Sequence, residues 1–277
     1  MNRTELGPAL RELRQASGKE AKAVARSAVM SPSKLSKIET GKVPPTVVDM
    51  ERILTAIGVS DEVKSEYMAA ARAQATEATA WRLVRRLGYH RKQQQIKALD
   101  DSTGLLRVFQ PSLVPGLLQT PEYVRALFGR KGLGEEPLGR AVAARLVRQQ
   151  SLYDAAKTIQ FVITEPVLRW RLLPPAMMAG QLDRILSASR LSHVDIRIVP
   201  LAAPQTDVPA HSFVIRDDRM VTIETVHAEV TVTDPRDVEL YVHKFDGFAA
   251  SAMVGEEMYR FIEAIRDEYL GAGQRME

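Results

Sequence analysis

The sequence predicts a mostly α-helical protein with an α/β part. We expect an N-terminal bundle of five short helices, a linker helix and a C-terminal mixed α+β domain with a small, partly antiparallel sheet. Three observations support this: apolar residues at helical spacing before residue 100, short β-branched runs after it, and 277 residues at 45% hydrophobic content, enough for two cores. The expected segments are 1–75, 76–100 and 101–277.

Short amphipathic segments bounded by capping residues fill the first 75 positions. Thr46 and Asp49 have the spacing of a capping box, and residues 29–30 leave room only for a tight turn between the second and third helices. The predicted helices cover residues 6–16, 21–28, 31–41 and 46–57, with a fifth from residue 60.

The third of these segments has complete capping signals. Ser31 can cap the first free amides, Pro32 fits the first helical position, and Gly41 can take the left-handed backbone that ends a helix. Leu35 and Ile38 are spaced to face inward. The sequence therefore predicts one short helix with a single apolar stripe.

The opposite face of this helix is polar, with Ser33, Lys34, Ser36 and Lys37 pointing outward. Lys34 falls in the first turn, where the helix dipole disfavours a cation by ~0.3–1 kcal/mol. A residue that breaks a local rule suggests function. A solvated helix surface is the simpler alternative, but the neighbouring helices favour a helix that reads DNA.

Five short helices with a two-residue turn before the third resemble the helix-turn-helix domain of lambda-repressor-like regulators, the XRE family, over residues 6–72. In that family the third helix enters the major groove of DNA. The resemblance implies that base edges are faced by Ser33 and Lys37. It implies that the phosphate backbone is faced by Lys34, Ser36 and Lys42, with a further contact from Thr40.

The resemblance also implies a structural ion pair between Arg14 and Glu39, with Gly41 as a structural glycine. The sequence departs from the family in helix two, which begins with Ala21 where a Gln is usual. Val29 replaces a small turn residue, and Pro32 replaces a side chain that often reads a base. Docking to DNA is therefore better defined than base preference, for which Lys37 is the best candidate.

Charge is distributed unevenly along the chain. Residues 1–100 hold 18 Lys and Arg against 11 Asp and Glu, a net of +7, whereas the remainder has a net of −3. Segregated positive charge indicates a polyanionic partner and binding that weakens as salt rises. The sequence contains no apolar run of about 18 residues, so it predicts no membrane-spanning helix. Because the start also lacks the apolar core of a signal peptide, we expect a cytoplasmic, nucleoid-associated protein.

Residues 66–99 are predicted as a nearly continuous helix that bends at Gly88 and is a candidate dimer element. Its basic side chains either extend the DNA footprint or are simply solvated; they are Arg82, Arg85, Arg86, His90, Arg91 and Lys92.

Short β-branched or alternating runs replace helical periodicity beyond residue 101. The predicted strands are 105–109, 159–163, 194–199, 212–216, 221–225 and 229–233. The last three have turn-sized gaps and predict an antiparallel meander. The predicted helices are 138–153, 176–189, 235–249 and 255–269.

Residues 109–123, which include Pro115-Gly116-Leu117-Leu118-Gln119-Thr120, resemble the hallmark segment of a C-terminal domain in actinobacterial XRE-type regulators. Members of that family commonly act in development or secondary metabolism, and their shared signal is unresolved. Physically, Pro115-Gly116 is a turn and Thr120 can cap a helix at Pro121. We favour this structural role over contact with a ligand.

Catalytic motifs are not evident. The five histidines lack metal-site spacing, and the sequence has no cysteine, nucleophile elbow, P-loop or dinucleotide fingerprint. Glu224, His227 and Glu229 are the only tight acid/base grouping, and strand positions favour a surface role for them. Trp170 is expected to be a core anchor rather than part of an aromatic pocket. We expect no enzyme activity, cofactor or metal.

The sequence thus predicts a homodimeric, sequence-specific regulator that binds double-stranded DNA at an inverted repeat. The C-terminal domain would modulate it through a small-molecule effector or a small partner protein, without a membrane partner. The alternative is an enzyme or ligand-processing domain that carries its own operator-binding helix-turn-helix.

Overall fold

The computed structural model describes residues 6–43, 45–80, 84, 86–204 and 207–273. The chain divides into two compact units, one mainly of residues up to 77 and the other mainly of residues from 78. The first is helical, and the second combines helices with a mixed sheet. The predicted fold class is confirmed.

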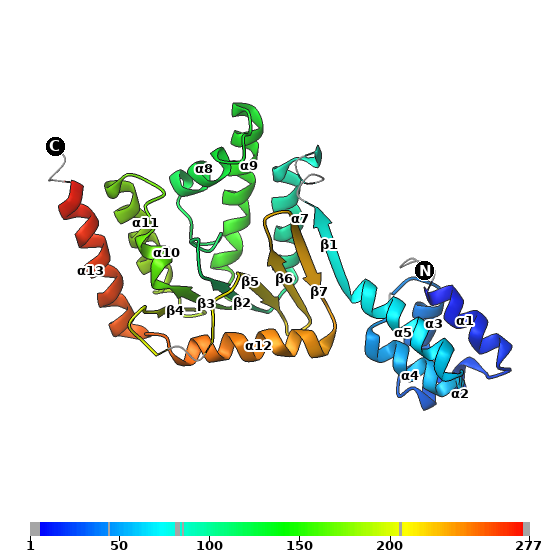
Figure 1. Cartoon of the computed structure of the whole chain (residues 1–277). Helices are drawn as coiled ribbons and strands as arrows, with labels where there is room; N and C mark the ends of the chain where they lie inside the picture. The colour runs from blue at the N-terminus through cyan, green and yellow to red at the C-terminus, as the bar shows by residue number, and fades with distance from the viewer. Residues whose placement is uncertain (1–5, 44, 81–83, 85, 205–206, 274–277) are drawn as a thin grey trace. The chain divides into compact units, whose positions relative to one another are not determined.

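The N-terminal unit is built from five short helices (Figure 1): α1 (Leu6–Ala16), α2 (Ala21–Ser27), α3 (Pro32–Glu39), α4 (Val47–Ile57) and α5 (Asp61–Ala75). Leu10, Leu35 and Ile53 are completely buried between them. The capping box at Thr46 and Asp49 is present at the start of α4, as predicted. Burial of these apolar stripes gives the unit its own core.

The segment that follows α5 differs from the continuous helix predicted for residues 66–99. Strand β1 (Thr76–Ala80) follows α5 directly, and the linker helix is a separate element, α7 (Tyr89–Asp101). Gly88, with φ +96°, lies at the break before α7. Pairing at the sheet edge overrides helix propensity in β1. Arg82 and Arg85 lie outside the described residues.

The second unit is organised around a seven-stranded sheet with the order β1-β7-β6-β5-β2-β3-β4. Its other strands are β2 (Leu105–Gln110), β3 (Thr158–Thr164), β4 (Val194–Val199), β5 (Phe213–Arg216), β6 (Met220–Glu224) and β7 (Ala228–Val232). Strands β2, β3 and β4 run parallel to one another, with Val108 of β2 opposite Phe161 of β3. Strand β5 pairs antiparallel with both β2 and β6. All six predicted strands are confirmed.

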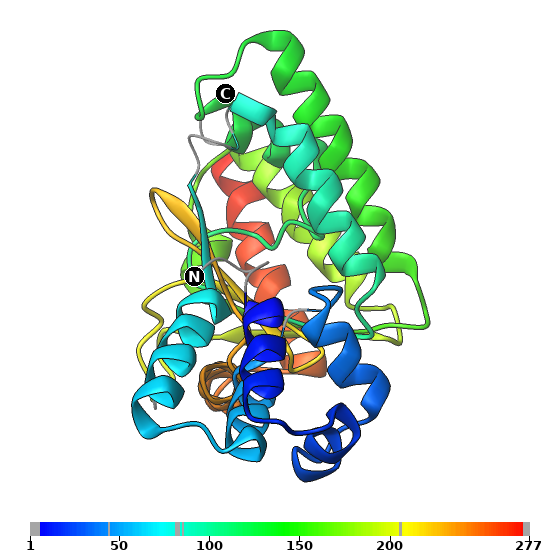
Figure 2. The same ribbon diagram turned by 90° about the vertical axis from the view of Figure 1, so that its right-hand side faces the viewer.

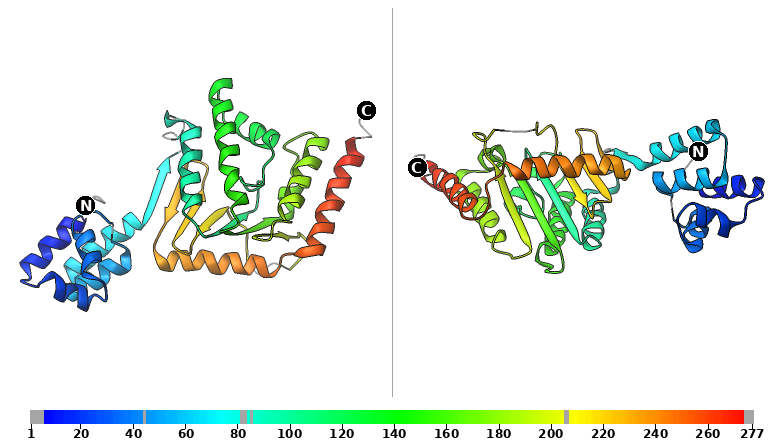
Figure 3. Two further views of the ribbon diagram at one scale, coloured as in Figure 1. Left: turned by 180° about the vertical axis from the view of Figure 1, so that it is seen from behind. Right: turned by 90° about the horizontal axis from the view of Figure 1, so that it is seen from below.

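Helices cover both faces of this sheet. They are α8 (Pro121–Gly129), α9 (Glu135–Arg148), the 3-10 helix η1 (Gln149–Tyr153), α10 (Glu165–Arg169), α11 (Pro175–Ala188), α12 (Pro235–Ala250) and α13 (Gly255–Gly273). Helix α12 crosses one face (Figure 3), where its Phe248 stacks on Phe109 with ring centroids 4.3 Å apart. Helices α7 and α9 lie side by side (Figure 2).

The main core lies between the opposite face of the sheet and α11 and α13, and it includes Phe161, Leu182 and Ile262. Trp170 is not part of it: the prediction of a core anchor is wrong, because this side chain is 59% exposed. Helix α10 ends at Arg169, so Trp170 lies beyond its buried face. Among the described residues, no helix combines the length and apolarity needed to cross a membrane.

Candidate nucleic-acid interface and a buried polar network

The sequence of α3 determines where this helix begins and ends. The Ser31 hydroxyl accepts a hydrogen bond from the Lys34 amide at 3.1 Å, and Pro32 occupies the first helical position. Leu35 and Ile38 are completely buried, and Gly41 adopts φ +70° just beyond the helix. Because the apolar side chains all point inward, the remaining face of α3 is available to a partner.

A bidentate ion pair holds α3 against α1. Arg14 Nε donates to Glu39 Oε1 at 2.7 Å, and Arg14 Nη2 donates to Glu39 Oε2 at 3.0 Å. The hydrogen bond to Glu39, opposed by burial, raises the pKa of Arg14. Arg14 Nη1 also donates a hydrogen bond to the Lys19 carbonyl oxygen at 3.1 Å. This geometry is the structural pairing that the family resemblance implies.

Sequence reasoning missed Gly7, which brings α1 and α3 into close contact. A Cβ at this position would lie only 2.1 Å from the Ile38 carbonyl oxygen. No L-residue with a side chain fits there unless the backbone of α3 moves. A glycine inside an otherwise amphipathic helix, where alanine is favoured by about 0.5–1 kcal/mol, is the signal that identifies such a contact.

The residues predicted to contact DNA surround the outward face of α3. Ser33, Ser36, Lys37, Thr40 and Lys42 are all exposed. The Thr40 hydroxyl donates to the Ser36 carbonyl at 2.8 Å, so its proton is used in closing the helix. Within the described part of the chain, no ion pair engages Lys37. This face therefore presents hydroxyl groups and a free cation.

Lys34 differs from the other predicted contacts because it already has a partner. Its Nζ lies 2.7 Å from Oδ1 of Asp49, and the side chain is 47% exposed. Burial opposes ionisation of Asp49, but hydrogen bonds from Lys34 and Thr46 outweigh it, and the net effect lowers the pKa of Asp49. This pairing offsets the unfavourable position of a cation at a helix start, so that position alone is not evidence of function.

The turn before α3 is strained. Val29 has φ +55° and is 76% exposed. A left-handed backbone costs an L-residue about 1–2 kcal/mol, and a β-branched side chain is especially unsuited to it. The position where the family resemblance expects a small residue is therefore one that glycine would occupy without strain.

Side-chain amides fasten the segment of residues 109–123 that resembles a regulator domain. Gln149 Nε2 donates to the Gly116 carbonyl at 2.9 Å, and Gln181 Nε2 donates to the Leu118 carbonyl at 2.8 Å. The Thr120 hydroxyl caps α8, as the sequence predicts. The segment thus has the structural role that its turn and capping residues favour.

Two family models match this chain, one over the N-terminal helices and one over the domain that contains the sheet. Residues 93–264 match the model of a domain of unknown function, DUF5753, and residues 5–67 match that of a helix-turn-helix domain. The chain belongs to the DUF5753 family. No curated protein matches it.

Solved structures share limited similarity with this DUF5753 protein. Nuc, a phospholipase D family member from Salmonella typhimurium, is 13% identical with a TM-score of 0.35, covering 65% of this chain and 98% of its own. NucT from Helicobacter pylori is 8% identical with a TM-score of 0.38 and the same coverages, 65% and 98%. TrmBL2, an archaeal chromatin protein, is 12% identical with a TM-score of 0.35, covering 75% of this chain and 70% of its own. These scores are too low to support an argument about fold or function.

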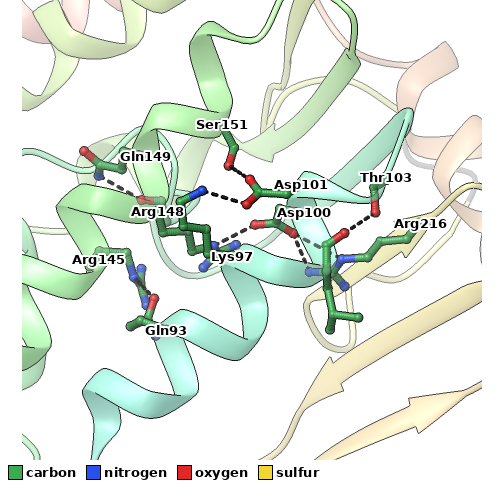
Figure 4. Close-up of polar contacts among 12 residues, drawn as sticks. Gln93, Lys97, Asp100, Asp101, Thr103, Arg145, Arg148, Gln149, Ser151 and Arg216 are labelled. Atoms are coloured by element: carbon green, nitrogen blue, oxygen red, sulfur yellow. Dashed lines mark hydrogen bonds and ion pairs between the residues drawn. The ribbon is translucent and has the colours of Figure 1, made fainter.

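A buried carboxylate organises the polar interior of the DUF5753 domain (Figure 4). Asp100 at the end of α7 is 1% exposed; its Oδ2 accepts from Arg148 Nε at 2.7 Å and its Oδ1 from Arg216 Nη2 at 2.9 Å. These bonds join α7, α9 and β5. Sequence reasoning missed the cluster, because its members are separated by up to 116 positions. The one local sign of this cluster in the sequence is Arg216, a charged residue at the end of an otherwise apolar strand.

A second buried pair joins Lys92 of α7 to Glu229 of β7. Lys92 is one of the basic side chains that the sequence offers for a wider DNA footprint, but its ammonium group pairs with Glu229. Glu229 therefore pairs with Lys92, while His227 lies 3.4 Å from the Thr225 hydroxyl. Among the described residues, no group of three or more His, Cys, Asp or Glu side chains is arranged to hold a metal.

Proposed function

We propose that this protein is a sequence-specific, DNA-binding transcription regulator that acts as a homodimer on an inverted-repeat operator. The observation that carries the proposal is the outward face of α3, where exposed Ser33, Ser36 and Lys37 lie opposite the buried Leu35 and Ile38. A helix fixed in this way can enter the major groove with its polar side chains toward base edges.

Two further features support DNA as the partner. Residues 5–67 match a helix-turn-helix domain, and the first hundred residues carry a net charge of +7. Lys37 and Ser33 are the proposed base contacts. Ser36, Lys42, Thr40 and Lys34 are the proposed backbone contacts, although Lys34 must leave Asp49 to reach a phosphate. A cytoplasmic, nucleoid-associated location follows from this proposal.

The DUF5753 domain is proposed to regulate DNA binding by responding to a small ligand or a small partner protein. A ligand that prefers one of two dimer arrangements shifts the population of the DNA-binding form. We propose binding rather than catalysis for this domain, because Glu229, a member of the acid/base grouping noted in the sequence, is held by Lys92. A role in development or secondary metabolism follows from the resemblance to actinobacterial XRE-type regulators.

Selection from a pool of random duplex DNA tests this proposal. The full chain should enrich an inverted repeat whose half-sites lie about 34–36 Å apart, one helical turn, or a multiple of it. Mapping of the bound sites in the genome should then recover the same motif in promoters. If the selected pool has no common motif, or the motif is a single asymmetric site, the proposal of a sequence-specific dimer is contradicted.

A further inference from the structure

A cavity of about 90 Å³ lies in the DUF5753 domain beside the Pro115–Gly116 turn. Because one water molecule needs about 10–15 Å³, the cavity has room for a small organic molecule. Its wall has a polar part and an apolar part. The polar part includes Arg145, Arg148 and Arg216, and the apolar part includes Leu113 and Leu127.

Charges around the cavity do not cancel. Arg148 and Arg216 share the single carboxylate of Asp100, and Lys92 pairs with Glu229. Glu224 also lines the cavity but is exposed at its edge. Three arginines and two glutamates line the cavity; counting the ion-pair partners Lys92 and Asp100 as well gives four cations and three carboxylates, which leaves one positive charge. The imbalance suits a ligand with a single negative charge, because Glu224 and Glu229 repel additional charge.

Arg145 carries this excess charge. Its Nε donates to Gln93 Oε1 at 2.6 Å and its Nη1 to Gln119 Oε1 at 2.9 Å, both neutral acceptors. In the described residues, no carboxylate forms an ion pair with it. Burial, together with the charge of Arg148, lowers the pKa of Arg145 to about 9, so the guanidinium remains a cation at neutral pH. The Arg145 side chain is partly buried, and charges withdrawn from water in proteins are normally paired.

The surroundings of Arg145 hold its side chain in place. Its Cζ lies 5.1 Å from the centre of the Phe128 ring. Gly116 is also close, and a Cβ at this position would lie 2.4 Å from Arg145 Nη1. The glycine of the Pro115–Gly116 turn therefore makes room for a guanidinium that is oriented by two amides and an aromatic ring. Such an arrangement is preorganised for an anion.

We infer that this cavity binds a small monocarboxylic acid, whose carboxylate accepts hydrogen bonds from Arg145 while a short apolar tail contacts Leu113 and Leu127. The planar guanidinium matches the two oxygens of a carboxylate. The inference rests on the regulatory role proposed above and names its ligand class; through Leu113 it adds a ligand contact to the structural role of residues 109–123. It is tested without DNA, so its failure and that of the DNA proposal are distinguishable.

Isothermal titration calorimetry of the full chain with butyrate, benzoate and inorganic phosphate at constant ionic strength tests the inference. At least one carboxylate should bind saturably, and Arg145→Gln should weaken its Kd at least tenfold. The matched control, Arg140→Gln, lies on the same helix; Arg140 pairs with Glu136 at the surface, and the variant should leave the Kd unchanged. If Arg145→Gln fails to fold, Arg145→Lys, which keeps the charge but loses the planar fork, should weaken binding instead.

Absence of saturable binding by both carboxylates overturns the inference. Equal affinities for the native protein and the folded Arg145 variant overturn it as well. Tighter binding of phosphate than of either carboxylate contradicts the proposed ligand class.

Discussion

At the scale of single residues, two lysines on one short helix have different environments. Lys37 is exposed with no ion pair among the described residues, whereas Lys34 is held by Asp49 at 2.7 Å. The sequence placed both on the outer face of the helix, but it did not reveal Asp49 as a partner, because the capping box of the next helix supplies that carboxylate. Lys37 is therefore the stronger candidate for reading a base.

We expect Lys37→Ala to relax the preference for one base pair in each half-site. A side chain that donates to a base edge contributes about 1–3 kcal/mol of discrimination, and this is what the variant loses. Competition binding with operators substituted one position at a time measures the effect. Arg52→Ala removes an exposed cation from α4 and serves as the control. An unchanged base profile for Lys37→Ala would remove this residue from the proposed reading face.

The Asp49 carboxylate predicts a pH dependence for α3 and α4. Its pKa in the folded protein is below the ordinary value of 3.8, so ionised Asp49 stabilises the fold above that pH, and this contribution is lost as the pH falls through the folded pKa. The protection factors of these helices, which correct for the slower intrinsic hydrogen exchange in acid, should therefore fall as the pH drops through the folded pKa. The difference in protection between the native protein and Asp49→Asn should shrink from about pH 6 to about pH 3. A constant difference over this range would contradict the assignment.

At the scale of elements, close contact between α1 and α3 depends on a glycine. We expect Gly7→Ala to destabilise the helix-turn-helix domain by about 3 kcal/mol or more, because its methyl group overlaps the backbone of Ile38. Hydrogen exchange of α1 and α3 measures this loss. Gly139→Ala in α9, where a Cβ meets no atom within 4 Å, is the matched control and should gain about 0.5–1 kcal/mol. Equal protection in Gly7→Ala and native protein would rule out the close contact.

Three elements of the DUF5753 domain depend on Asp100. Replacing it by Asn leaves Arg148 and Arg216 without their shared carboxylate, and removal of one partner from a buried ion pair costs about 3–5 kcal/mol. Calorimetric unfolding should show this loss. Asp246→Asn alters an exposed aspartate of α12 that has no ion pair among the described residues, and it should change stability by less than about 0.5 kcal/mol. Similar effects of the two variants would mean that the buried network adds little to stability.

An element can be predicted from the sequence when the interactions that define it are between residues close together in the chain. The cap at Ser31, the capping box at Thr46 and strands β2 to β7 are encoded by neighbouring residues, and the sequence predicts them. Strand β1 is defined by pairing at the edge of the sheet and was predicted as helix. Gly7 and Asp100 act through partners distant in the sequence, so their roles emerge only when those partners are in place.

At the scale of the whole molecule, the two compact units have separate tasks in the proposed function. One presents the α3 face to DNA, and the other contains the polar network with the Arg145 cavity. Charge is also segregated between the two ends of the chain, since the first hundred residues carry a net charge of +7 and the remainder −3. Attraction to phosphates supplies affinity for any duplex, whereas the face of α3 must supply the preference for one sequence.

Sequence-specific recognition through α3 is tested most directly by a salt series with two duplexes, the inverted repeat obtained by selection and the same bases shuffled. Binding of the full chain is measured by fluorescence anisotropy. Binding to both duplexes should weaken as salt rises, and the affinity for the selected duplex should be at least about 10³-fold higher than for the shuffled one. Lys37→Ala should narrow this ratio while leaving affinity for the shuffled duplex nearly unchanged. Equal affinity for the two duplexes, or no binding at low salt, would contradict sequence-specific recognition through α3.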